Sequence, residues 1–357
     1  MSNDTHWPET DGSSGQLSSQ IRRRAIDAGT GRKTAHTEVE VNKLPGSRLA
    51  TTRYSAIFRR FISEGILLCK LREPMPDAVP SAPRLRSRAA VVSRAILLGI
   101  VIGMTAANAW PLLLLNLSVP FAVATETLFL GFYVYWVSGS GPPRQWRAFR
   151  AACFRVHALV PSEWAWGLIA AIGFALTIHS SIVLLFRFEP YPAATFHRGY
   201  DFSFISSRSL QWLACVFSAI SAGVCEETGF RGYMQRPIER CIGPAPAIFI
   251  SSLFFALIHL SKSWALLGMV PIIFGAGLLL GLLARASDSL IFCMIGHTVM
   301  DVGLFAYWWT QIAGVFGQNP LSQSGLDFAF LLECATFVLF LSLTLFAIRK
   351  LGLSRIF

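Results

Sequence analysis

Long apolar stretches alternate with short polar loops from about residue 94 to near the C-terminus. Each stretch approaches the ~20 residues that an α-helix needs to cross the hydrocarbon core of a bilayer. Because only helices and closed barrels satisfy their backbone polar groups in lipid, we predict an all-α, polytopic membrane helix bundle of about eight transmembrane helices. The predicted spans are residues 94–116, 119–138, 163–186, 208–231, 244–262, 264–284, 288–309 and 326–348.

The first 93 residues lack this pattern. Residues 1–54 are rich in Ser, Thr, Gly and charged residues, and we predict a disordered, basic cytoplasmic tail. In residues 55–72, apolar residues recur at helical spacing among arginines and lysines. Both a basic amphipathic helix on the membrane surface and a tail with chance periodicity fit this segment, which a Pro-rich linker follows. The predicted divisions are the tail at 1–54, the surface helix and linker at 55–93, the membrane domain at 94–350 and a short cytoplasmic tail at 351–357.

Composition and charge agree with a membrane protein. The 357-residue chain is 53% hydrophobic and 14% charged, whereas a soluble domain is about a quarter charged. The net charge is +11, and the basic N-terminal region lies beside the first predicted span. That location favours anionic lipid headgroups as the partner and argues against nucleic acid.

Ionisable residues within the predicted spans gather in three short motifs. A charged group in hydrocarbon is costly unless it is paired or faces a polar cavity, so such residues are candidates for function. The motifs are Glu226-Glu227-Thr228-Gly229-Phe230-Arg231, Phe255-Ala256-Leu257-Ile258-His259 and His297-Thr298-Val299-Met300-Asp301.

The spacing predicts that the first two motifs meet. Gly243 and Pro244 break the chain between two helical segments. Glu226 lies 17 residues before Gly243 and His259 lies 16 residues after it. In two antiparallel helices with equal rise per residue, these positions are nearly level, so Glu226 and His259 can meet across a helix pair.

Residues four apart share one face of a helix. His297 and Asp301 therefore lie on one face, and Glu227 and Arg231 can form an ion pair that lowers the cost of burying both. Because neighbouring residues of a helix point about 100° apart, the two adjacent glutamates cannot have the same role. We expect Glu226 to face a cavity while Glu227 pairs with Arg231.

These residues suggest amide hydrolysis within the membrane. Glu226, helped by His259, would take a proton from water, and the His297 imidazole would stabilise the oxyanion. The structural interpretation is that the charges are helix–helix contacts, which for any one motif is the more common case. We apply that interpretation to three other ionisable residues in predicted spans, which are Glu126, His179 and Glu333.

The pattern Glu-Glu-x-x-x-Arg, Phe-x-x-x-His and His-x-x-x-Asn/Asp resembles the CPBP family. This family comprises the type II CAAX prenyl endopeptidases and bacteriocin-processing proteins and is also called the Abi family. The resemblance covers about residues 205–310 and implies an eight-helix membrane fold. It implies that Glu226 is the catalytic base that activates water, with His259 as its partner, and that His297 and Asp301 form the oxyanion hole. The implied supporting pair is Glu227 and Arg231.

The resemblance leaves the cofactor open between a divalent metal such as zinc and a metal-free glutamate mechanism. In the metal-dependent form, the ligands would be Glu226, His259 and His297. We favour the metal-free form, because the family accepts Asn, a poor metal ligand, at the position of Asp301. An ionised Asp301 cannot donate a hydrogen bond, so it would orient His297 or favour a metal.

The resulting hypothesis is a CAAX-type intramembrane protease that cleaves a membrane-associated protein or peptide. The resemblance allows a prenylated C-terminal tail, a bacteriocin leader or a sorting tail as the substrate. The sequence lacks the His-Glu-x-x-His of zincin-like site-2 proteases and the Gly-x-Ser-Gly of rhomboids. The alternative is a non-proteolytic scaffold, an immunity or regulatory protein, or a transporter, in which the charged cluster holds helices together.

The loop charges predict the orientation. The loops that would share a side with the N-terminus are rich in Arg and Lys, whereas residues 310–325 contain neither. Since cytoplasmic loops carry the excess of Lys and Arg, we expect an integral protein of a bacterial inner membrane with both termini cytoplasmic. Cysteine labelling from the cytoplasm should reach positions 30 and 355, and labelling from the opposite side should reach position 318. Labelling of position 30 from the outside would invert this topology.

Overall fold

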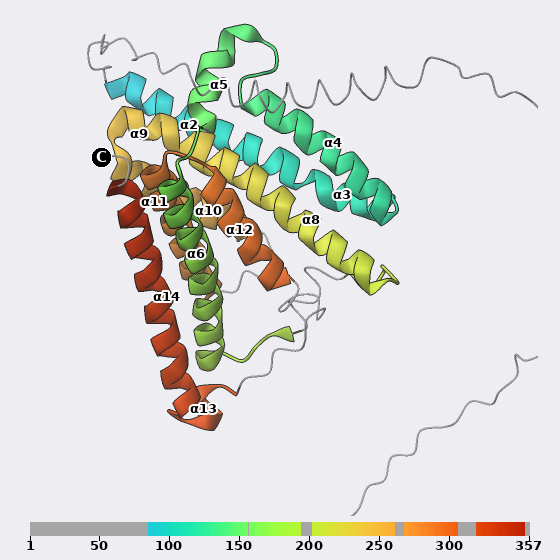
Figure 1. Cartoon of the computed structure of the whole chain (residues 1–357), viewed down its shortest axis with the longest axis vertical. Coiled ribbons are helices and arrows are strands. Elements are labelled where there is room, and N and C mark those ends of the chain that lie inside the picture. The colour runs from blue at the N-terminus through green and yellow to red at the C-terminus, as the bar shows by residue number, and fades with distance from the viewer. Residues whose placement is uncertain (1–84, 156, 194–201, 261–267, 306–318, 354–357) are drawn as a thin grey trace, which may run out of the picture. The chain divides into compact units, whose positions relative to one another are not determined.

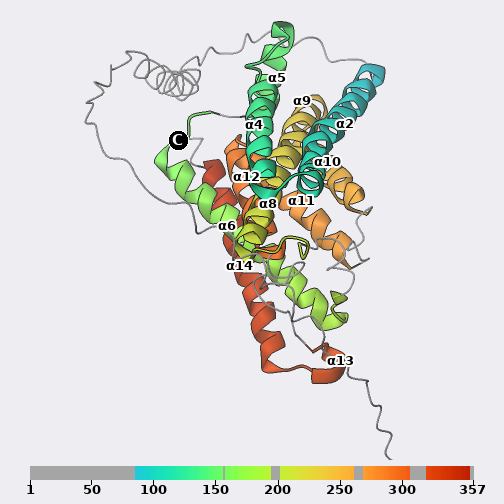
Figure 2. The same ribbon diagram turned by 90° about the vertical axis from the view of Figure 1, so that its right-hand side faces the viewer.

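The computed structural model describes residues 85–155, 157–193, 202–260, 268–305 and 319–353, and these contain helices and no strand. The elements are α2 (Leu85–Ala107), α3 (Ala109–Asn116), α4 (Val119–Val137), η2 (Arg144–Trp146), α5 (Arg147–Phe154), α6 (Pro161–Phe188), α8 (Arg208–Glu227), η3 (Thr228–Gln235), α9 (Arg236–Ile242), α10 (Pro244–His259), α11 (Met269–Ser287), α12 (Ile291–Leu304), α13 (Leu321–Ser324) and α14 (Phe328–Leu353). Figures 1 and 2 show these helices packed together as a bundle, and this confirms the predicted all-α membrane fold. The predicted tail and surface helix lie outside the described residues.

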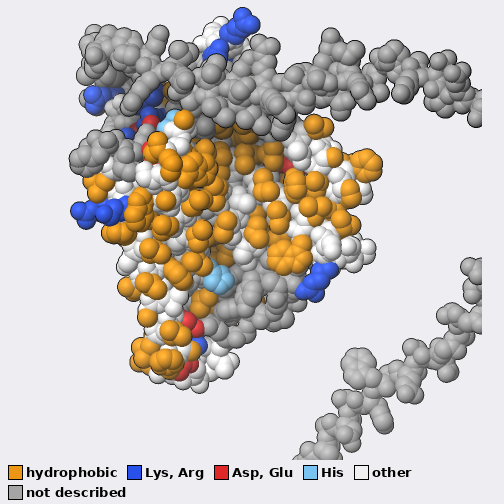
Figure 3. Space-filling model, in the orientation of Figure 1, with side chains coloured by type: hydrophobic (Ala, Val, Ile, Leu, Met, Phe, Trp, Pro, Cys, Tyr) orange, Lys and Arg blue, Asp and Glu red, His pale blue; other side chains and the backbone are white. Residues whose placement is uncertain are grey.

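Six helical segments of the described chain are long and apolar enough to cross a membrane. They are Arg88–Asn116, Val119–Val137, Pro161–Phe188, Arg208–Ile242, Met269–Ser287 and Phe328–Leu353. Figure 3 shows one face of the bundle, on which hydrophobic side chains predominate and the described Lys and Arg side chains lie toward the margins. The first helix begins at Leu85, earlier than the predicted start at residue 94, because the arginines in its first turns do not interrupt it.

Helices α10 and α12 are shorter than the spans predicted for them. They contain 16 and 14 residues, which at the rise of an α-helix is about 24 and 21 Å against a hydrocarbon core of about 30 Å. Six helices of the described chain meet the length and composition of a membrane span, so the predicted number of about eight is not confirmed. The short helices end at His259 and Leu304, beside two of the three sequence motifs.

Ion pairs connect the chain segments at the arginine-rich end of the bundle. Arg155 lies 2.5 Å from Glu239 and donates a hydrogen bond of 3.1 Å to the carbonyl oxygen of Ala284. Arg236 lies 3.5 Å from Glu239 and 3.0 Å from Asp288. These contacts join the segment before α6 to α9 and to the turn between α11 and α12, at the end predicted to be cytoplasmic.

Two acidic residues for which we expected a structural role have polar partners. On α4, Glu126 accepts a 2.6 Å hydrogen bond from the hydroxyl of Ser221 on α8. At the end of α6, Arg187 lies 3.7 Å from Glu333 and 2.6 Å from Asp327, and its hydrogen bond holds the pKa of Asp327 below its usual value. Both contacts connect one helix to another, as the structural interpretation predicts.

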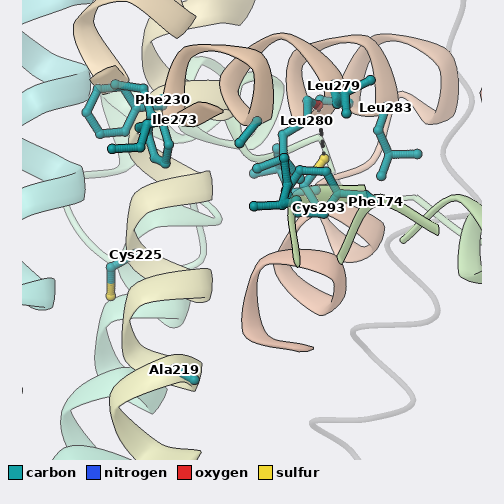
Figure 4. Packing of buried hydrophobic residues seen from close by; sticks show 14 of the residues in the cluster. Phe174, Ala219, Cys225, Phe230, Ile273, Leu279, Leu280, Leu283 and Cys293 are labelled. Atoms are coloured by element: carbon teal, nitrogen blue, oxygen red, sulfur yellow. Dashed lines mark hydrogen bonds between the residues drawn. The ribbon is translucent and has the colours of Figure 1, made fainter. Parts of the chain in front are cut away.

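The core between α6, α11 and α12 is apolar and closely packed. Phe174, Leu280 and Leu283 are at most 1% exposed, and Figure 4 shows them around Cys293 of α12. The Cys293 thiol donates a 3.3 Å hydrogen bond to the carbonyl oxygen of Leu280. Cys293 is therefore a small buried residue that joins α12 to α11.

Glycines bring α2 into backbone contact with η3. A Cβ atom added to Gly229 would lie 2.4 Å from the carbonyl oxygen of Gly99 and 2.6 Å from the Cα of Gly103. Gly99 and Gly103 form a Gly-x-x-x-Gly motif, which lets membrane helices approach closely. Our sequence analysis did not use this motif, although its spacing is visible in the chain.

This contact predicts that Gly229→Ala destabilises the protein. Because the methyl group would overlap the backbone of α2, we expect a loss of about 1–3 kcal/mol in the free energy of unfolding. The control is Gly131→Ala on α4, where an added Cβ meets no atom within 4 Å. Unfolding in detergent should show a lower midpoint for Gly229→Ala alone, and equal midpoints for the two variants would contradict the close contact.

Candidate active site

The two adjacent glutamates end α8, immediately before a change in helix type. The chain continues as a helix to Ile242, in agreement with the sequence prediction, but residues Thr228–Gln235 form a π-helix, η3. Single π-helical turns within α-helices are frequent at functional sites. Glu226 lines a pocket, whereas Glu227 is completely buried. The predicted difference between the two glutamates is therefore present.

Glu226 and His259 face each other from α8 and α10. The distance from Glu226 Oε2 to His259 Nε2 is 3.9 Å, which is too long for a direct hydrogen bond. His259 Nδ1 lies 2.7 Å from the carbonyl oxygen of Phe255. Because a carbonyl oxygen only accepts hydrogen bonds, Nδ1 carries a proton, and in its neutral form the ring presents an unprotonated Nε2 to Glu226. Two acceptors thus converge on one small space.

Glu227 binds two partners. Its Oε1 accepts a 2.9 Å hydrogen bond from Arg231 Nη1, so the predicted ion pair is present. The same oxygen lies 2.7 Å from His297 Nδ1 on α12. Side chains of Glu227 and Arg231 are fully buried and that of His297 is 3% exposed. The contact with His297, which the sequence did not predict, connects the supporting pair to the third motif.

His297 and Asp301 share one face of α12, as their spacing predicts. His297 Nε2 lies 3.5 Å from Asp301 Oδ2, and both residues line the same pocket as Glu226 and His259. His297 thus has Glu227 at one ring nitrogen and Asp301 near the other. The structure brings all four residues that were predicted to be catalytic to one pocket.

Phe255 packs against both histidines. Its ring centroid lies 4.7 Å from that of His259 and 5.9 Å from that of His297. The Arg231 guanidinium stacks over the same ring at 4.3 Å, a favourable cation–π geometry. Phe255 was not among the predicted site residues, although its place in the Phe-x-x-x-His motif was a signal that could have identified it.

The pocket combines one polar wall with apolar surroundings. It lies between side chains of α6, α8, α10, α11 and α12. Beyond the four ionisable residues, apolar side chains form most of the lining, and they include Ile178, Ile182, Ile273, Met300, Leu304 and Phe305. An apolar segment of a substrate could therefore lie against a few polar groups.

Comparison with known families supports this arrangement. Residues 208–303, which contain all three motifs, match the model of the family "type II CAAX prenyl endopeptidase Rce1-like". The matched segment is thus similar to the type II CAAX prenyl endopeptidases. No curated protein and no solved structure matches the chain. The match confirms the resemblance for residues 208–303 and supports, as a general class of activity, an intramembrane CAAX-type protease.

The described part of the chain defines no metal site. Among the described residues, no group of three or more His, Cys, Asp or Glu side chains is placed to hold a metal ion. His297 Nδ1 contacts Glu227, which leaves Nε2 as the ring nitrogen on the side of the pocket. A zinc site in a protein uses three or four protein ligands. The described residues define no cofactor, and we derive no step through a metal.

The contacts of Glu227 predict strong coupling to Arg231. Removing one partner leaves a buried charge unpaired, so Glu227→Ala and Arg231→Ala should each cost about 3–5 kcal/mol in the free energy of unfolding. The double variant should lose less than the sum of the two single losses. Equilibrium unfolding of the four proteins in a double-mutant cycle measures the difference, and strictly additive losses would exclude direct coupling.

Proposed function

We propose that the chain is an intramembrane endopeptidase that hydrolyses a peptide bond of a membrane-associated protein or peptide. The observation that carries this proposal is the pair formed by Glu226 Oε2 and His259 Nε2, 3.9 Å apart on the polar wall of a mostly apolar pocket. The family match to residues 208–303 agrees with it.

Glu226 and His259 activate water in this proposal. Two acceptors cannot hydrogen-bond to each other, but a water molecule has two O–H donors and satisfies both. Its lone pairs then point into the pocket, toward the carbonyl carbon of a bound peptide. As the oxygen attacks, Glu226 takes the proton, and it returns that proton to the leaving amine when the C–N bond breaks.

His297 stabilises the negative charge that develops on the carbonyl oxygen. When both ring nitrogens are protonated, Nδ1–H donates to Glu227 and Nε2–H is available to the oxyanion. Asp301, 3.5 Å from Nε2, supports this protonated ring. Glu227 contacts both Arg231 and His297 Nδ1, so this pair holds the His297 ring on the side away from Nε2.

The lining of the pocket indicates the class of substrate, and the charges of the loops indicate the orientation in the membrane. Its apolar lining suits a lipid-modified or hydrophobic peptide segment, and the matched family is named for prenyl endopeptidases. We place both termini in the cytoplasm, since the loops at that end carry the excess of arginine. The basic N-terminal residues would then lie near anionic lipid headgroups.

The assignment of Glu226 predicts that Glu226→Gln abolishes cleavage. The substitution is nearly isosteric but removes the base, so we expect a loss of about 10²–10⁴-fold in kcat. The assay uses the purified full-length protein and a synthetic peptide with a farnesylated cysteine in a C-terminal Cys-aliphatic-aliphatic-X sequence. Comparative proteomics of cells carrying wild type or Glu226→Ala would identify natural substrates. Wild-type rates for Glu226→Gln would disprove the assignment.

Asp301→Asn tests the role of the acid. If Asp301 supports a protonated His297, the neutral amide should lower kcat while the protein stays folded. Unchanged activity would instead mean that Asp301 acts only as a hydrogen-bonding group. Both proteins should be assayed with and without a chelator. Complete inhibition that one specific metal reverses would overturn the metal-free mechanism.

A further inference from the structure

One face of α10 is aligned with α8 and η3 over two helical turns. Ser251, Phe255 and His259 follow each other at intervals of four residues, and each of them contacts α8 or η3. His259 faces Glu226, and the ring of Phe255 packs edge-on against that of Phe230 at 5.3 Å. A step of four residues back along α10, from His259 to Phe255, therefore corresponds to a step of four residues forward along the opposite segment, from Glu226 to Phe230. The register of this pair sets the separation of Glu226 from His259.

The hydroxyl of Ser251 contacts the main chain of η3 directly. Ser251 Oγ donates a 2.9 Å hydrogen bond to the carbonyl oxygen of Phe230, and the residue is 2% exposed. A serine side chain has a single carbon between the backbone and the hydroxyl. This bond therefore ties the backbone of α10 to the π-helical turn with little freedom, whereas the ring contact between Phe255 and Phe230 tolerates sliding.

We propose that Ser251 is a positioning residue, whose bond to the Phe230 carbonyl fixes the register of α10 and thereby the gap between His259 and Glu226. The inference rests on the proposed role of those two residues in activating water. A shift by one residue along the helix axis moves His259 by about 1.5 Å. A displacement of that size either closes the 3.9 Å gap or stretches it toward the longest distance that one water molecule can bridge with two hydrogen bonds.

The neighbouring serine provides a matched control. Ser252 is 1% exposed and also belongs to α10, but its hydroxyl donates a 2.7 Å hydrogen bond to the carbonyl oxygen of Ile248 in the same helix. Replacing either serine with alanine removes one buried hydroxyl. Only Ser251→Ala removes a bond between α10 and η3.

The kinetic test compares Ser251→Ala, Ser252→Ala and wild type on the farnesylated peptide. Misplacement by about 1 Å can cost up to about 10²-fold, so we expect Ser251→Ala to lower kcat at least tenfold with KM within about twofold. Ser252→Ala should keep both constants near wild type. Equal kinetic effects of the two substitutions would overturn the proposal. If Ser251→Ala does not fold, Ser251→Cys, which fills the site with a weak donor, takes its place in the comparison.

A second measurement does not depend on catalysis. Cysteines at positions 226 and 259 are joined with a short thiol-reactive crosslinker, and the single-cysteine proteins report the background from native cysteines. Adding Ser251→Ala should lower the yield of crosslinked protein several-fold, whereas Ser252→Ala should not. An unchanged yield with Ser251→Ala would refute the positioning role. Activity retained by Glu226→Gln would instead refute the proposed function, so the two failures are distinguishable.

Discussion

The carboxylate of Glu227 is buried among hydrocarbon and must be satisfied within the protein. Its Oε1 accepts a hydrogen bond from Arg231, one turn later, and contacts His297 Nδ1 on α12. The pair with Arg231 lowers the cost of burying either charge. The contact with His297 also holds α12 against α8. Since adjacent helical residues point about 100° apart, turning Glu227 toward α12 also leaves Glu226 free to face the pocket.

The bundle places these groups through close backbone contacts and short helices. Gly99 and Gly103 let α2 touch Gly229, so the π-helical turn that follows the glutamates is held from one side by α2. Ser251 of α10 binds the same turn through Phe230. The last residues of α10 and α12, His259 and Leu304, both line the pocket. Polar groups at the ends of these helices can therefore reach the interior of the bundle.

The family match and the geometry concern the same part of the chain. Residues 208–303 extend from the start of α8 to the end of α12 and hold every ionisable residue of the pocket. The flanking helices contribute differently, since α6 supplies part of the apolar lining and α2 packs behind η3. The proposed hydrolysis needs water and a base within an apolar environment. The pocket combines both requirements, with four ionisable side chains against a mainly apolar lining.

Much of this arrangement could be predicted from the sequence, because the lengths of the apolar stretches and the spacing of the ionisable residues indicate it. Apolar length predicted the helices, and the spacing around Gly243 predicted that Glu226 would meet His259. Four-residue intervals predicted the ion pair of Glu227 with Arg231 and the shared face of His297 and Asp301. These are local properties of helices or of two helices joined by a short turn, so the chain itself determines them.

Other features depended on contacts between helices distant in sequence. The bond between Glu227 and His297 joins residues 70 positions apart, and the one between Tyr133 and the backbone at Cys225 spans 92. Which face of α12 meets α8 is decided by packing over many residues, and no local spacing encodes it. The π-helical turn and the short lengths of α10 and α12 have the same origin. The sequence by itself determined the candidate site residues and their spacing along each helix, and the tertiary structure decided which of them touch.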